Sequence, residues 1–152
     1  MIPLLPLTAT TIFFLPSSSP SLLAKSVIAE PSKEIVTSKS NGNQQVLNAY
    51  QARQSGVIVE NVSGVVEAIL PDDNEGSRHQ RFIIRLAAGN TLLIVHNIDL
   101  APRFDRLRVG DRGLIIGDYE WNDRGGLIHW THHDPRRVHE GGWIDHNGLR
   151  YQ

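Results

Sequence analysis

The sequence of 152 residues contains no cysteine, and it contains no lysine after Lys39. Without cysteine the chain can form no disulfide, no thiolate nucleophile and no thiolate metal ligand. A bound metal would have to be held by histidines and carboxylates. The formal net charge of −1 provides no overall attraction to polyanions, so nucleic-acid binding would require a local basic patch.

Signatures of several enzyme classes are also absent. The chain has no Gly-x-Ser-x-Gly elbow, no His-Glu-x-x-His motif and no glycine-rich loop that leads into a helix to cradle phosphate. The sequence therefore predicts no catalytic residue.

The longest apolar run, residues 4–15, is too short to span a bilayer but has the length of a signal-peptide core. Residues 26–29 end in a small residue, as a cleavage site would. We predict that residues 1–29 form a signal-peptide-like segment and that the protein is exported, to the periplasm or medium, with no stable transmembrane segment after processing. Since no Lys or Arg precedes the run, a mis-assigned start codon and a loosely membrane-associated tail remain alternatives.

A change of composition marks the start of the folded domain. Residues 30–43 are rich in Pro, Ser, Lys and Asn, which is typical of a disordered linker, and every basic residue after them is arginine. With 40% hydrophobic and 20% charged residues, the chain suits one globular domain, which we place at residues 44–152.

The periodicity within this domain changes from helical to extended. Residues 44–54 favour a short amphipathic helix. Strands are predicted at residues 57–59 with 64–70, and at 80–86, 91–96, 114–121 and 127–132. Residues 100–107 favour a turn or a brief helix. This order predicts an all-β fold, a small OB-like five-stranded barrel with a short N-terminal helix and a C-terminal tail; an open five-stranded sheet capped by the helix is the alternative.

Residues 119–135 are the most informative segment, because they contain two strands joined at Gly125-Gly126 and three of the seven histidines. Alternation along a strand would place Ile128, Trp130 and His132 on the core side. His129 and His133 would then lie about 13 Å apart on the other side, too far to share one zinc ion without bending. Candidate metal ligands, for a metal-dependent hydrolase, are therefore His96, His129, His132, Asp134 and His139. The alternative is that these rings form structural hydrogen bonds that tie the hairpin to the tail.

Arginines form the second group of candidate residues. Arg81 and Arg85 are expected on the outer face of one strand, with Arg103 in the following connector. Guanidinium groups bind phosphate and carboxylate in a bidentate manner, although interspersed aspartates would neutralise them by local ion pairing. The predicted ligand-binding residues are Arg81, Arg85, Arg103, Tyr119, Trp121, His129, Trp130 and His132.

Several blocks of the domain resemble one family. They are residues 79–82, 96–103, 119–121, 129–132, 134–135 and 142–151, and together they are similar to DUF3465, a family of small, mostly exported bacterial proteins without an assigned function. The resemblance implies no activity. Together with the arginines and aromatics, it leads us to predict a non-catalytic binding module for a nucleic acid, an acidic glycan or an envelope protein. The metal-dependent hydrolase and a passive envelope scaffold are the alternatives.

Overall fold

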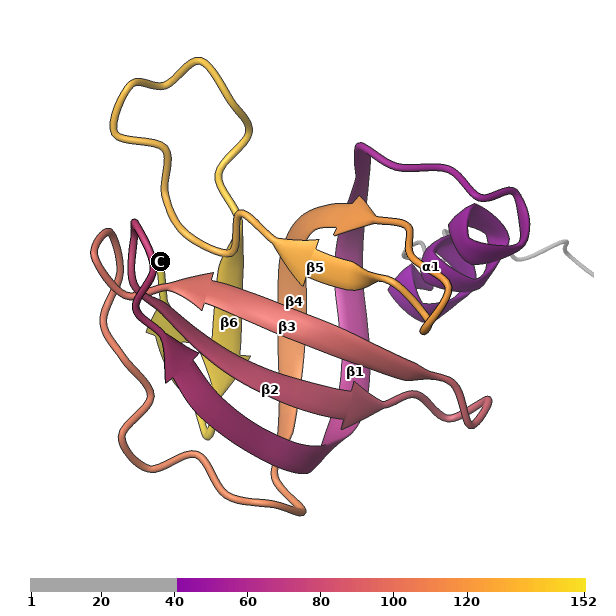
Figure 1. Ribbon diagram of the computed structural model, residues 1–152, viewed down its shortest axis with the longest axis horizontal. Helices are drawn as coiled ribbons and strands as arrows, with labels where there is room; N and C mark the ends of the chain where they lie inside the picture. Colours follow the sequence, from indigo (N-terminus) through magenta and orange to yellow (C-terminus); the bar gives the residue numbers. More distant parts are fainter. Residues whose placement is uncertain (1–40) are drawn as a thin grey trace, which may run out of the picture. The chain divides into compact units, whose positions relative to one another are not determined.

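The computed structural model describes residues 41–152 (Figure 1). The predictions for the export segment and for most of the linker lie outside this range. The described elements are α1 (Gly42–Gln51), β1 (Val57–Asp73), β2 (His79–Arg85), β3 (Thr91–Asn97), β4 (Arg112–Glu120), β5 (Leu127–His129), β6 (Trp143–His146) and β7 (Leu149–Tyr151). The predicted all-β class is confirmed.

Five strands form a closed ring in the order β1-β2-β3-β5-β4, because β1 also pairs with β4 (Figure 1). The strand β1 has 17 residues, and its two halves pair with different neighbours. It bends at a bulge between Val59 and Val62, where Asn61 has a φ of 58°. The pairing of β3 with β5 is parallel, and the other pairings are antiparallel. The ring of five strands was predicted from the sequence, and the β1–β4 pairing excludes the open-sheet alternative.

Alternation along β2 and β3 fills the ring with apolar side chains, among them Phe82, Ile84, Leu92 and Ile94. The polar residue Gln80 also points inward. Its amide donates to the carbonyl of Phe104 at 3.1 Å and accepts from the backbone N–H of Phe104 at 2.8 Å. The buried amide is therefore satisfied, and it holds the β3–β4 connector against the end of the ring.

The helix α1 is docked on the bulge of β1. Val46 and Ala49 are buried in the main core, and the Asn43 side chain exchanges two hydrogen bonds with the backbone of Ser63, at 2.8 and 2.9 Å. Gly42 opens the helix in contact with the backbone of Glu60, where a Cβ would overlap the carbonyl oxygen. The helix thus begins at Gly42, two residues before the predicted residue 44.

The C-terminal segment differs from the predicted tail. Residues 143–151 form the β6–β7 hairpin, and β6 pairs with β4 outside the five-strand ring. The β3–β4 connector contains turns but no helix. Strand β5 ends at His129, three residues earlier than expected, because Trp130 adopts a left-handed backbone with a φ of 53°.

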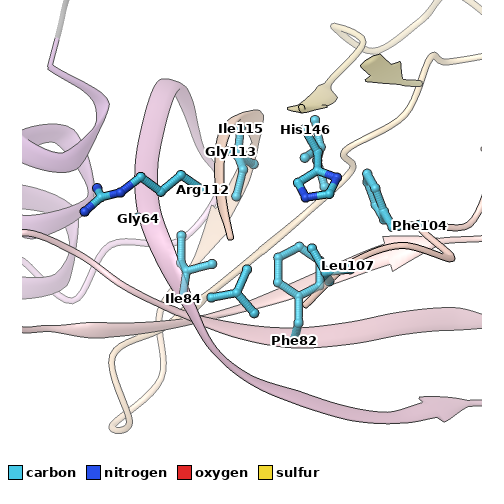
Figure 2. Close-up of a pocket in the computed structure, with 11 residues that line it drawn as sticks. Gly64, Phe82, Ile84, Phe104, Leu107, Arg112, Gly113, Ile115 and His146 are labelled. Atoms are coloured by element: carbon cyan, nitrogen blue, oxygen red, sulfur yellow. The ribbon is translucent and has the colours of Figure 1, made fainter. Parts of the chain in front are cut away.

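The described part of the ring offers little internal space for a ligand. Figure 2 shows the apolar pocket at one end, where Phe82, Ile84, Phe104 and Leu107 converge with His146. Its internal volume is about 10 Å³, no more than a single water molecule requires. A partner of larger size must therefore contact the outside of the ring.

Candidate binding face

The register of the strands places a row of aliphatic side chains across the outside of the ring. Ile83 of β2 is opposite Leu93 of β3, and Leu93 is level with Leu127 of β5. All three are partly exposed, whereas the residues on either side of them in sequence are buried. We call Ile83, Leu93 and Leu127 the apolar row.

A hollow of about 200 Å³ lies beside the apolar row. Leu70, Ile83 and Leu93 line it together with Asn122 and Arg124 from the β4–β5 turn. The Asn122 carboxamide oxygen accepts the backbone N–H groups of Arg124 and Gly126, at 2.9 and 3.0 Å. These bonds order the turn and hold it at the rim of the hollow.

The exposed Arg124 differs from the arginines that the sequence singled out. Arg81 lies 4.0 Å from Asp73, Arg85 pairs with Glu67, and Arg103 pairs with Asp72 at 3.0 Å. Among the described residues, none forms an ion pair with Arg124. The guanidinium at the hollow is therefore available to a ligand, while the three predicted ones are locally neutralised.

Next to the apolar row lies a group of carboxylates and imidazoles from β4, β5 and the loop of residues 130–142. Asp118 and His129 are directly opposite each other, and Glu120 Oε1 lies 3.7 Å from His129 Nε2. His139 reaches Asp118 from the loop, with Nε2 at 2.8 Å from Oδ2. We call Asp118, Glu120, His129 and His139 the acid–imidazole cluster, and the cluster, the apolar row and the hollow together the binding face.

The surroundings of His139 favour the charged form of its ring. Its Nδ1 lies 2.6 Å from the carbonyl of Glu140, and its Nε2 faces the carboxylate of Asp118. Both partners are acceptors, an arrangement that favours a proton on each ring nitrogen. The Glu140 carbonyl, followed by the charge of Asp118, raises the pKa of His139 above its usual value.

Three buried polar atoms in this region have no hydrogen-bond partner. They are Asp118 Oδ1, His129 Nε2 and Trp130 Nε1. Trp130 stacks against two histidine rings, with centroids 4.9 Å from His132 and 4.4 Å from His139. Buried polar atoms in native proteins nearly always have a hydrogen-bond partner, so three exceptions close together mark this region as a candidate functional site.

The five predicted metal ligands do not come together. His96 is buried inside the ring, where Nδ1 lies 2.8 Å from Thr131 Oγ1 and Nε2 lies 3.1 Å from the Pro102 carbonyl. His132 Nδ1 contacts the carbonyl of His133, and the Asp134 carboxylate accepts three backbone N–H groups of its own loop. Within residues 41–152, no group of three or more histidines and carboxylates is arranged to hold a metal ion. The positions of these side chains give the hydrolase alternative no support.

The predicted ligand-binding residues are divided among several environments. Tyr119 is 0% exposed and belongs to the core, and His132 is also buried, so neither contributes to an exposed surface. Trp121 is half-buried, with the Arg53 guanidinium 5.5 Å from its ring centroid. His129 remains at the binding face, and Trp130 packs against His139 beside it. His132 is buried on the core side, where alternation along the strand had placed it, and this burial removes it from the predicted ligand-binding surface.

Sequence reasoning missed most of the binding face. The alternation of β2 and β3 could have identified Ile83 and Leu93 as outward-facing apolar residues. Asp118 and Glu120 had no such signal, because their proximity to His129 and His139 depends on strand register and on the path of a loop.

Comparison with known proteins gives a family but no function. No curated protein matches the chain. No helix within residues 41–152 is long and apolar enough to cross a membrane. Residues 31–152 match the family model described as "Protein of unknown function (DUF3465)", and the chain therefore belongs to the DUF3465 family.

Proposed function

We propose that this domain is a non-catalytic module that binds a protein partner through the binding face. The proposal depends on one observation above all: a partly exposed aliphatic row borders a hollow whose rim carries the unpaired Arg124. An apolar side chain of the partner would fill the hollow, and a nearby carboxylate would meet the guanidinium.

Nucleic acids fit this face less well. None of the described residues that line the hollow is aromatic, whereas single-stranded nucleic acids bind through stacking on aromatic rings. The carboxylates of Asp118 and Glu120 also lie on the face and would repel phosphate. Acidic glycans meet the same repulsion, so a protein segment with apolar and charged side chains is the favoured partner.

Peptide selection tests the proposal directly. A phage-displayed library selected on the folded domain should enrich peptides that combine a large apolar residue with an acidic one. Their affinity, measured by calorimetry, should fall about tenfold or more for Ile83→Asp and for Arg124→Ala.

Matched controls come from the exposed β3–β4 connector. Val109 is 65% exposed and Arg108 forms no ion pair among the described residues, so Val109→Asp and Arg108→Ala should leave binding unchanged. Failure to enrich any peptide, or equal binding by all four variants, would contradict the proposal. Salt-dependent binding of an oligonucleotide or an acidic glycan would instead assign the module to another class of partner.

We also propose that the domain acts after export, because residues 4–15 have the length and composition of a signal-peptide core. Expression of the full chain in a bacterium provides the test. A shortened protein that begins near residue 30 in the periplasm or medium supports export, and a full-length cytoplasmic protein contradicts it.

A further inference from the structure

We infer that the loop of residues 130–142 is a proton-controlled cover over one end of the binding face, held closed by the contact between His139 and Asp118. The inference rests on the proposed function, since it concerns regulation of the same face. In Figure 1 this loop projects from the ring between β5 and β6.

The contact that closes the cover requires a proton. His139 can donate from Nδ1 to the Glu140 carbonyl and from Nε2 to Asp118 at the same time only while the ring is cationic. When the ring loses a proton, the remaining one can serve only one of the two acceptors. A lone pair of the other nitrogen then faces an oxygen, and the attraction is replaced by repulsion.

Hydrogen bonds within the loop allow it to move as a unit. The Asp134 carboxylate accepts the backbone N–H groups of Arg136, Val138 and His139 at 2.7 to 2.9 Å. These bonds link the middle of the loop to His139, the residue that contacts Asp118. At the base, the N–H of Gly142 donates to the His132 carbonyl at 3.0 Å. The left-handed Trp130 lies at one end of the loop, and Gly141, where even a Cβ would meet only ordinary contacts, lies at the other, where backbone rotation would be absorbed.

The closed position also has an opposing cost. Asp118 Oδ1, His129 Nε2 and Trp130 Nε1 are buried without partners. Movement of the loop would admit water to these atoms and satisfy them. The closed position is thus stabilised by the proton-dependent contact between His139 and Asp118, and it is destabilised by the three unpaired atoms. Because these two effects oppose each other, two positions of the loop are accessible.

The charges around His139 determine the direction of the switch. Asp118 of β4 contacts the ring, Asp134 of the loop lies close enough to favour its charge, and Glu140 contributes its backbone carbonyl. On the other side the ring stacks on Trp130, which follows His129 of β5, and His129 Nε2 lies 3.7 Å from Glu120 of β4, beyond hydrogen-bond distance. The surroundings thus favour the imidazolium, and the cover is closed at low pH and released as the pH rises through the His139 pKa.

Histidine NMR and tryptophan fluorescence test the opening without any ligand. Between pH 5 and pH 9, His139 should titrate above the ordinary histidine pKa of about 6.5. Trp130 fluorescence and hydrogen exchange at the amides of Val138 and His139 should change with the same midpoint. Asp118→Asn should lower that midpoint, and Trp130→Phe should remove the fluorescence change.

His133→Gln is the matched control, because His133 is an exposed histidine of the same loop. It should leave the transition unaltered. A His139 that titrates at or below the ordinary value, or a loop signal that is flat in the wild type, would overturn the inference. An identical transition in Asp118→Asn would do the same.

Binding separates this inference from the proposed function. Peptides selected on the binding face should bind the wild type about tenfold more weakly at pH 5.5, where the cover is closed, than at pH 8.5. This difference in affinity should vanish in His139→Gln. Equal affinity at both pH values would overturn proton control while leaving the binding module intact. A loop that opens as described in a protein that binds no peptide would support the cover and reject the binding function.

Discussion

The polar groups inside the ring differ from those on the binding face in how completely they are hydrogen-bonded. His96 and Gln80 are fully enclosed, yet each of their polar atoms has a partner. Asp118, His129 and Trp130 are less enclosed, and each has a buried atom without one. The interior thus resembles a satisfied structural network, whereas the outer cluster retains unused bonding capacity of the kind associated with binding and switching.

The pKa values of His96 in the interior and His139 on the binding face are shifted in opposite directions. Burial lowers the pKa of His96 to about 4, against which the hydrogen bond to Pro102 acts only in part. The pKa of His139 is raised, because both of its nitrogens face acceptors. The interior of the ring therefore disfavours the charged form of this side chain, and the binding face favours it.

Removing the interior imidazole should have the largest effect. We expect His96→Ala to lower the free energy of unfolding by about 2–5 kcal/mol, because it creates a cavity and leaves Thr131 Oγ1 and the Pro102 carbonyl unpaired. Urea denaturation measures the loss. The matched control is His79→Ala, which should cost much less, because His79 is half-exposed and belongs to no such hydrogen-bond network within the described residues. Equal losses in the two variants would contradict the distinction between interior and surface histidines.

Acid should destabilise the protein through protonation of His96. Since the pKa of His96 is about 4 in the folded state and about 6.5 in the unfolded state, the unfolded chain binds more protons between these values. Stability should fall as the pH drops from about 6.5 to 4, by at most about 3 kcal/mol. Thermal unfolding of the wild type and of His96→Gln measures this, and the variant should show a flatter profile. Parallel profiles would assign the acid sensitivity to other groups.

The outer cluster should contribute little to stability. We expect Asp118→Asn to change the free energy of unfolding by less than about 1 kcal/mol, because the His139 side chain is 32% exposed and partly exposed ion pairs are weak. Chemical denaturation at pH 6 provides the measurement. A loss as large as that of His96→Ala would make the cluster a structural element rather than a functional one.

The smallest effect is expected for an exposed ion pair. Arg103 is 41% exposed and pairs with Asp72 and Asp105, so Arg103→Ala should cost about 0–1 kcal/mol in urea denaturation. It should also leave peptide binding unchanged, although the sequence predicts that Arg103 binds a ligand. Loss of peptide binding in Arg103→Ala would instead support the ligand-binding role that the sequence predicts for this arginine.

Much of the ring could be predicted because alternation is local. Phe82 and Ile84 point inward and Arg81 and Arg85 outward, as the period of two required, and the Gly125-Gly126 turn joins β4 to β5 as expected. Prediction failed where the backbone leaves its regular period. The left-handed Trp130 ended β5 early, and Thr131, which alternation would place on the outer side, is buried. The pairing of residues 143–146 with β4 could not be predicted, because it joins segments far apart in sequence.

By itself the sequence determined the all-β class, the short helix and which side chains of β2 face the core, because these follow from the spacing of neighbouring residues along one strand or helix. Only the tertiary structure decided which histidine has a lowered pKa and which a raised one. That difference depends on burial inside the closed ring for His96, and on the contact with Asp118 for His139, which the path of one loop brings about.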